Sequence, residues 1–275
     1  MSAAAAAAKL AVQMYTVREF TKTAGDFAET LRKISDIGYQ AVQLSAVGAM
    51  SGDSPEVDAK TARQMLDDNG LACIATHRSW DALAGQTEAE IDFHHTLGCP
   101  FAAIGGIPKD YGDRGAAGYR DFVREAAPVI ATLKAGGVAW GYHNHAHEFA
   151  RLPDAERTPG CQTLFDLFIE EGGPDFLLEI DLFWAWHGGV DPAALVARCA
   201  GRVPVLHLKD KEVVQGSREP VIAPIGEGNL PWAERILPAC RAAGTRWYAV
   251  EQDVCRRDPF DCLRSSFVFL SRQAL

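Results

Sequence analysis

Four residues of this chain combine metal-binding side chains with positions at or just beyond the ends of short apolar runs. They are Glu148, Asp181, His207 and Glu251. Three carboxylates and one imidazole at one mouth of a barrel would hold a divalent cation, because hard cations prefer oxygen ligands and Mn²⁺ also accepts imidazole. The same site would leave room for a sugar, provided that the strands converge.

The most conspicuous local motif is "YHNHAHEF", in which His143, His145 and His147 alternate and Glu148 follows. In a continued strand the three histidines would lie on one face and bind zinc or another borderline metal. The alternative is that one or two of them only make hydrogen bonds in a loop. The motif by itself leaves the choice between the histidines and Glu148 open.

The elements that would position these residues follow one repeated pattern. Short apolar runs alternate with longer amphipathic segments, and no Pro/Ser-rich linker separates two halves. The segment that ends at Ile37 has helical spacing and is followed by Gly38 as a C-cap, and the helical segment 57–69 stops before Gly70 in the same way. The predicted strands are 10–15, 41–45, 71–77, 101–105, 138–143, 176–181, 203–208 and 247–251.

Eight predicted strands that alternate with helices indicate an α/β fold, and they favour a single (β/α)8 TIM barrel over an open doubly wound sheet. No glycine-rich phosphate-binding motif follows the first predicted strand. We expect the barrel domain to cover residues 9–275 and the Ala-rich segment 1–8 to form a disordered tail.

Strand phase gathers polar side chains at the mouth of this barrel. Residues two apart share a face of a strand. The side chains of His207 and Lys209 therefore lie on one face, and those of Asp181 and Glu179 lie on one face of their own strand. His77 also ends a predicted strand. Catalytic residues of such barrels come from the C-terminal ends of the strands, so this is where we expect the site.

Composition limits the classes of partner. The formal net charge of -9 disfavours nucleic acid, and no apolar stretch approaches the roughly 20 residues that cross a bilayer. The seven cysteines are scattered and form no C-x-x-C pair, which favours buried, reduced thiols and a cytoplasmic location. A small-molecule partner fits best.

The chain resembles the xylose isomerase-like sugar isomerase/epimerase superfamily, from "LAVQMYTVRE" near its start to "YAVEQD" near its end. That group includes ketose 3-epimerases, hydroxypyruvate isomerase and inosose dehydratase. A glutamate after strand five, an aspartate after strand six, a histidine ending strand seven and a glutamate ending strand eight hold its divalent metal. The resemblance assigns these metal-ligand roles to Glu148, Asp181, His207 and Glu251.

The resemblance also implies a role in carbohydrate metabolism by proton transfer next to a metal-bound carbonyl, with Glu148 and Glu251 as the catalytic pair. Mn²⁺ is the expected cofactor, with Mg²⁺, Co²⁺ and Zn²⁺ as alternatives. Four further residues are expected to contact the sugar, namely His77, Lys209, Trp184 and His143. Gln43 and the "FWAW" segment depart from familiar branches and leave the substrate open.

Three hypotheses of function therefore stand. The first is a metal-dependent isomerase or epimerase of a keto sugar, and the second is a lyase or dehydratase that uses the same enolate on a keto-glycoside or inosose. The third is a catalytically silent sugar-binding barrel. The nuclease branch of the superfamily is disfavoured by the negative charge. Relatives often form dimers or tetramers, so a homodimer or homotetramer is expected.

Overall fold

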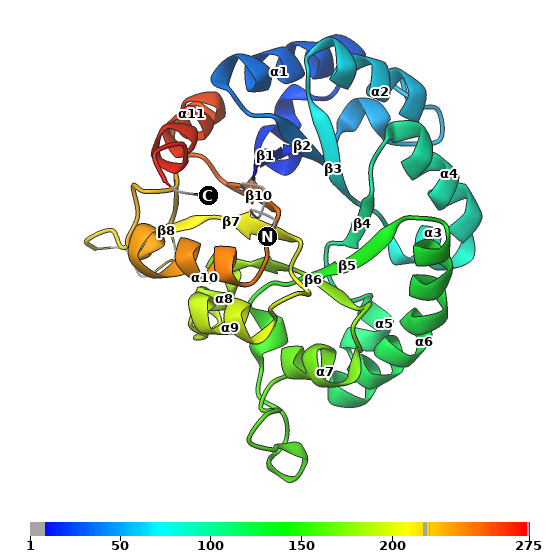
Figure 1. Ribbon diagram of the computed structural model, residues 1–275, viewed down its shortest axis with the longest axis vertical. Helices are drawn as coiled ribbons and strands as arrows, with labels where there is room; N and C mark the ends of the chain where they lie inside the picture. The colour runs from blue at the N-terminus through cyan, green and yellow to red at the C-terminus, as the bar shows by residue number, and fades with distance from the viewer. Residues whose placement is uncertain (1–8, 217–218, 220, 274) are drawn as a thin grey trace, which may run out of the picture.

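Parallel strands close into a barrel in the computed structural model, which describes residues 9–216, 219, 221–273 and 275. The order around the barrel is β1-β10-β7-β6-β5-β4-β3-β2, so neighbours in sequence are neighbours in space (Figure 1). The predicted TIM barrel is confirmed, whereas the predicted tail, residues 1–8, lies outside the described residues. The barrel strands are β1 Lys9–Gln13, β2 Ala41–Leu44, β3 Ala72–His77, β4 Phe101–Ile104, β5 Ala139–His143, β6 Leu177–Asp181, β7 Val205–Leu208 and β10 Trp247–Val250.

Helices surround the strands on the outside (Figure 1). They are α1 Ala24–Ile37, α2 Ala59–Asp68, α3 Trp80–Gly85, α4 Thr87–Leu97, α5 Lys109–Gly112, α6 Gly115–Ala135, α7 Leu164–Glu171, α8 Leu182–His187, α9 Pro192–Arg198, α10 Leu237–Ala242 and α11 Pro259–Leu270. Short helical turns fill several connections, namely η1 Met14–Phe20, η2 Gly48–Met50, η3 His147–Phe149, η4 Asp154–Glu156 and the π-helix η5 Trp232–Ile236.

A small antiparallel hairpin follows β7 and was not expected from the sequence. Its strands are β8 Asp210–Glu212 and β9 Val221–Ala223. The buried Asp210 carboxylate anchors this segment, because it accepts hydrogen bonds from the backbone N–H groups of Gly226, Gly228 and Leu230. Strands of three residues are too short to show an alternating pattern, so neither strand was predicted.

The first helix, α1, begins and ends at capping residues. The Thr23 side chain accepts a hydrogen bond from the Asp26 backbone N–H and caps α1, and Gly38 ends the helix at a φ of 117°. A Cβ on Gly38 would lie 2.6 Å from Cζ of Phe267 in α11. Both the backbone conformation and the close packing of α11 therefore require glycine at this position.

The barrel interior is apolar in its lower half, toward the N-terminal ends of the strands. Its buried side chains are Ala11, Ala41, Ile74, Ala75, Phe101, Ala103, Val205 and Ala249. Phe101 fits because Gly141 has no side chain, since a Cβ there would lie 2.3 Å from Phe101 Cζ. A larger core, between the strands and the helices, holds most other buried apolar residues.

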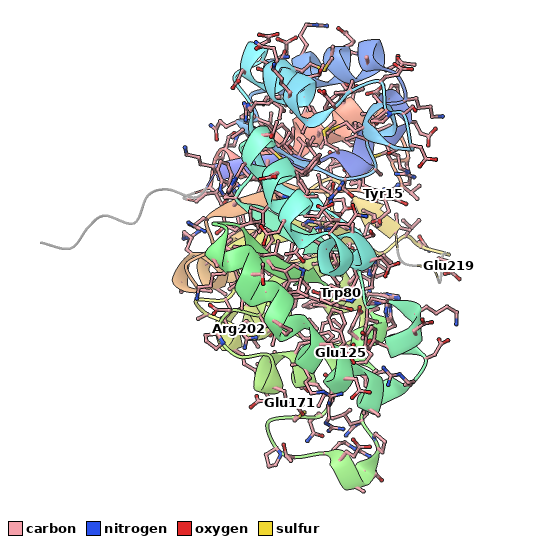
Figure 2. The ribbon with its side chains drawn as sticks, turned by 90° about the vertical axis from the view of Figure 1, so that its right-hand side faces the viewer. Tyr15, Trp80, Glu125, Glu171, Arg202 and Glu219 are labelled. Carbon is pink, nitrogen blue, oxygen red and sulfur yellow. The ribbon has the colours of Figure 1, made fainter. Side chains whose placement is uncertain are left out.

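We call the C-terminal ends of the strands the upper mouth of the barrel. Figure 2 labels Tyr15, which follows β1, on this side, and Arg202, which precedes β7, on the opposite side.

All seven cysteines are free, and five of them are buried. Among the described residues, no helix has the length and apolarity needed to cross a membrane.

Candidate metal centre

Three of the four predicted metal ligands converge at the upper mouth of the barrel. Asp181 ends β6, His207 lies in β7 and Glu251 directly follows β10, and all three are buried. Asp181 pairs with His207 in the β6–β7 register, and His207 pairs with Ala249 of β10. One potential ligand atom of each residue lies within 4.8 Å of the others, so this cluster can hold a metal ion.

The atoms that converge make their close contacts with charged groups of the same cluster. Asp181 Oδ2, His207 Nδ1 and Glu251 Oε2 are buried, and their partners are one another and the Lys209 ammonium. Buried charges are tolerated when they are paired or when they bind a metal ion. A divalent cation would satisfy all three at once, because carboxylate oxygen and neutral imidazole nitrogen are suitable donors.

The second nitrogen of His207 is held by neighbours on the other side. His207 Nε2 lies 2.8 Å from Gln43 Oε1 and 3.2 Å from Glu179 Oε2, and the Gln43 amide donates to Glu179 Oε1 at 2.9 Å. Because the amide oxygen can only accept, Nε2 carries a proton and the neutral ring presents the Nδ1 lone pair. This is the arrangement found around metal-binding histidines.

Neighbouring carboxylates favour the charged form of His207. Burial opposes the charge, but the carboxylates of Glu179 and Glu251 raise the pKa of His207 to about 10. His207 Nδ1 lies 2.8 Å from Glu251 Oε2. A metal ion at this point would have to displace the Nδ1 proton.

Lys209 is buried beside the same carboxylates. Its Nζ lies 3.0 Å from Asp181 Oδ2, 3.1 Å from Glu251 Oε2 and 2.8 Å from Asp253 Oδ2. Burial opposes the charge of Lys209, but these carboxylates raise its pKa well above the ordinary value. Lys209 therefore stays an ammonium.

The two carboxylates of the cluster differ in their proton affinity. Burial raises the pKa of Asp181 to about 6, although Lys209 acts against this shift. Burial also opposes ionisation of Glu251, but the charges of Lys209 and His207 outweigh it and hold the pKa of Glu251 well below its usual range. Glu251 therefore has the lower pKa of the two carboxyl groups.

Glu179 lies beneath this cluster and was given no role by sequence reasoning. Its Oε2 is 2.6 Å from His77 Nε2 and 3.7 Å from His143 Nδ1. Burial would raise the pKa of Glu179, but the imidazoles of His207 and His77 lower it to about 2. The signal for this residue was its two-residue spacing from Asp181, which places both side chains inside the barrel.

Glu148 does not join the other three predicted ligands. β5 ends at His143, and the chain then turns into η3, so Glu148 does not continue the strand. Its carboxylate accepts hydrogen bonds from the Tyr142 hydroxyl at 2.7 Å and from the His145 backbone N–H at 2.8 Å. It lies instead in a second group, with the side chains of His145 and His147.

A cavity of about 260 Å³ opens above the metal-binding cluster. Three of the predicted substrate-contacting residues, His77, His143 and Lys209, line it together with Glu251. Trp184 does not line this cavity; it borders an adjoining one. Sequence reasoning missed other lining residues, namely Tyr15, Ser45, Ala46, Gly105, His145 and Asp253.

The backbone of Ala46, in the wall of this cavity, is strained. It has a φ of 54°, the one positive φ of a non-glycine residue among the described residues. Such a conformation costs about 1–3 kcal/mol and tends to persist at functional sites, where the surroundings fix it. Its position on the cavity wall agrees with that tendency.

A sequence model of a family described as the xylose isomerase-like TIM barrel matches residues 31–253. The chain belongs to this family. The matched segment of this xylose isomerase-like barrel contains Asp181, His207 and Glu251. A search of curated proteins gave no match.

Solved structures with the same fold cover nearly the whole chain. A sugar phosphate isomerase/epimerase from Parabacteroides distasonis ATCC 8503 is 22% identical, with a TM-score of 0.76 over 98% of this chain and 95% of that chain. The probable 3-DHS dehydratase of petrobactin synthesis from Bacillus anthracis is 13% identical, with a TM-score of 0.71 over 96% and 99%. An L-ribulose 3-epimerase is 16% identical, with a TM-score of 0.67 over 96% and 93%. At these identities the likeness establishes a common fold.

Proposed function

We propose that this xylose isomerase-like barrel is a divalent-metal-dependent isomerase or epimerase of a keto sugar or sugar derivative. The observation that carries the proposal is the convergence of three buried ligand atoms, from Asp181, His207 and Glu251, beside a cavity. Two carboxylates and one imidazole favour Mn²⁺, with Mg²⁺, Co²⁺ and Zn²⁺ as alternatives.

The charge of the cluster supports a divalent cation. Glu179, Asp181, Glu251 and Asp253 contribute four negative charges, and the Lys209 ammonium contributes one positive charge. If His207 binds as a neutral imidazole, three negative charges remain, and one divalent cation would neutralise two of them. Buried charges are tolerated when they are paired in this way.

A divalent cation here would polarise the sugar carbonyl and stabilise the negative charge that develops when the neighbouring carbon loses its proton. Glu251 lines the cavity, so its carboxylate is placed to accept that proton. Lys209 also lines the cavity, and its ammonium can donate a hydrogen bond to a sugar oxygen. His77 is fixed by Glu179 and presents its ring to the same space.

Epimerisation needs a second proton carrier on another wall of the cavity. His143 and His145 lie there, at the end of β5, three strands around the barrel from β10. The sequence assigned this role, and a metal-ligand role, to Glu148. The Glu148 carboxylate lies beside His145 and His147 and apart from the Asp181, His207 and Glu251 cluster, so we assign the second proton transfer to His143 and His145.

A lyase or dehydratase is the second candidate function. Three imidazoles, those of His77, His143 and His145, line the cavity and can donate hydrogen bonds to a departing oxygen. The names of the structural neighbours include an epimerase and a dehydratase, so relatives of this fold carry both reaction types. Both reactions begin with the same proton abstraction.

The deciding experiment incubates the Mn²⁺-loaded protein in D₂O with a panel of keto sugars, inososes and a 3-keto glucoside. We expect deuterium at the carbon next to the carbonyl and an equilibrium of two sugars. Release of the aglycone or of water would instead assign the lyase or dehydratase. If neither the wild type nor Glu251→Gln exchanges deuterium with any sugar of the panel, the barrel is catalytically silent.

The metal assignment has its own test. Anomalous scattering from Mn²⁺-soaked crystals should place the ion between Asp181, His207 and Glu251, and Asp181→Asn should weaken Mn²⁺ binding. Glu148→Gln should leave Mn²⁺ affinity unchanged. An equal loss in Glu148→Gln would support the four-ligand set expected from the sequence.

A further inference from the structure

An outer cavity of about 460 Å³ adjoins the inner cavity of about 260 Å³ in which we place the sugar. The two cavities share Gly105 and His145 in their walls. We propose that the outer cavity binds a flat, uncharged ring joined to the sugar, so that the substrate is a keto sugar that carries an aromatic group. This inference deepens the proposed function and rests on it, because the inner cavity must hold the sugar.

The inner cavity alone is small for a ligand site. Pockets that bind small molecules usually have volumes of about 300–1,000 Å³. The inner cavity falls below that range, whereas the two cavities together lie within it. A single sugar would leave the larger of the two spaces empty, and a ligand with two parts would fill both.

Gly105, which directly follows β4, leaves space at the junction of the two cavities. A Cβ at this position would lie 3.4 Å from Nδ1 of His77, which lines the inner cavity. Gly105 does not have a positive φ, so its backbone conformation does not require glycine. The missing side chain instead provides room, because a larger residue here would extend between the sugar and the outer cavity.

Flat rings form much of the wall of the outer cavity. The imidazoles of His145 and His147 stack with centroids 5.8 Å apart, and the rings of Trp184 and His187 have centroids 5.7 Å apart. All four residues line the outer cavity. Aromatic rings prefer offset-stacked or edge-to-face contacts at centroid separations of about 4.5–7 Å, so this wall suits a flat ring.

Trp184 connects the outer cavity with the proposed sugar site. Its ring centroid lies 5.6 Å from that of His145, which lines both cavities, and 5.5 Å from Nζ of Lys209, which lines the inner one. A ring that stacks on Trp184 would therefore lie next to a sugar bound by Lys209. Trp184, which the sequence assigned to the sugar, would contact the group attached to the sugar.

The outer cavity offers no charged group that would select a phosphate. Among the described residues that line it, none is Lys, Arg, Asp or Glu. Proteins bind phosphate groups chiefly through Arg and Lys side chains. Lys209, in the inner cavity, is already paired with three carboxylates. The walls thus favour an uncharged ring over a phosphate as the second part of the substrate.

Calorimetric titration of the Mn²⁺-loaded protein with methyl and phenyl β-glucoside tests the proposal. These glucosides lack a carbonyl group, so no reaction accompanies binding. The phenyl glucoside should bind at least about 10-fold more tightly than the methyl glucoside, because aromatic contacts add to the apolar area that is buried. Glucose 6-phosphate should bind no more tightly than glucose.

Substitutions in the outer cavity should change the preference for the phenyl glucoside. Trp184→Leu should abolish it, whereas Trp184→Phe, which keeps a flat ring, should retain most of it. His187→Ala removes an exposed ring from the cavity wall and should reduce the preference by a smaller factor. His95→Ala removes an exposed histidine of α4, whose ring bonds the Gly136 carbonyl, and should leave the preference unchanged.

Three results would overturn the ring-binding role of the outer cavity. They are equal affinities of the wild type for the two glucosides or no measurable binding of either, a preference that survives both Trp184→Leu and His187→Ala, and tighter binding of glucose 6-phosphate than of glucose. The proposed function fails separately, when no sugar of the panel exchanges deuterium although the phenyl glucoside still binds with its preference.

Discussion

The lower and upper halves of the barrel interior are built by the same strands with opposite kinds of side chain. β7 contributes Val205 below and His207 above, and β10 contributes Ala249 below and Glu251 just beyond its end. Both members of each pair point inward, because residues two apart share a face of the strand. One strand phase thus supplies an apolar core at one end and buried charge at the other.

This difference separates the residues that stabilise the barrel from those that we expect to bind metal and substrate. Burial of apolar side chains in the lower half stabilises the barrel, whereas burial of Glu179, His207 and Lys209 costs free energy that their mutual contacts only offset. Substitutions below should therefore change stability, and substitutions above should change metal binding and catalysis.

The largest effect is expected for Glu251→Gln. Loss of the ionised carboxylate removes the proton acceptor, and general base catalysis contributes about 10²- to 10⁴-fold to rate. The measurement is the rate of deuterium exchange into the substrate, with Glu125→Gln on the exposed face of α6 as a matched control. Exchange at the wild-type rate in Glu251→Gln would remove this residue from the chemistry.

Phe101→Ala should give the next largest effect, on stability alone. The Phe101 ring fills the lower interior against Gly141, and truncation of a buried Phe costs about 3–5 kcal/mol. Denaturant unfolding measures the loss, and Phe20→Ala, whose side chain is 40% exposed, should cost less. A change in Mn²⁺ affinity in Phe101→Ala would break the division between the two halves.

Removal of the divalent metal should destabilise the upper half. A ligand present at 100 times its Kd stabilises a protein by about 2.7 kcal/mol, which corresponds to roughly 5–10 °C in Tm for a domain of this size. The comparison is the Tm of the Mn²⁺-loaded protein before and after chelation. If Asp181→Asn loses as much Tm on chelation as the wild type, the metal lies elsewhere.

Gln43→Leu should have the smallest effect of this series. The Gln43 amide orients His207 and Glu179, and loss of such a supporting group weakens metal binding by about 10- to 100-fold. Mn²⁺ titration measures the affinity, with Gln40→Leu just before β2, at an exposed position, as the control. Unchanged Mn²⁺ affinity in Gln43→Leu would mean that His207 needs no such support.

Sequence reasoning placed side chains correctly where a regular strand extends to the barrel mouth. Alternation gave the inward direction of Asp181 and His207, because a parallel barrel strand keeps its phase to its last residue. Glu148 follows the end of β5, and its direction depends on a turn and on the Tyr142 hydroxyl. Glu179 was on the correct face, but only the packing of His77, Gln43 and His207 around it reveals its function.

The sequence by itself determined the order of strands and helices, the barrel and the inward phase of Asp181, His207 and Lys209. These properties follow from local periodicity and glycine caps, which act over a few residues. The tertiary structure alone decided which ligand atoms meet, that Glu148 pairs with His145 and His147, and that Lys209 lies among three carboxylates. Those outcomes depend on loop conformations and on contacts between strands far apart in the sequence, which no local pattern encodes.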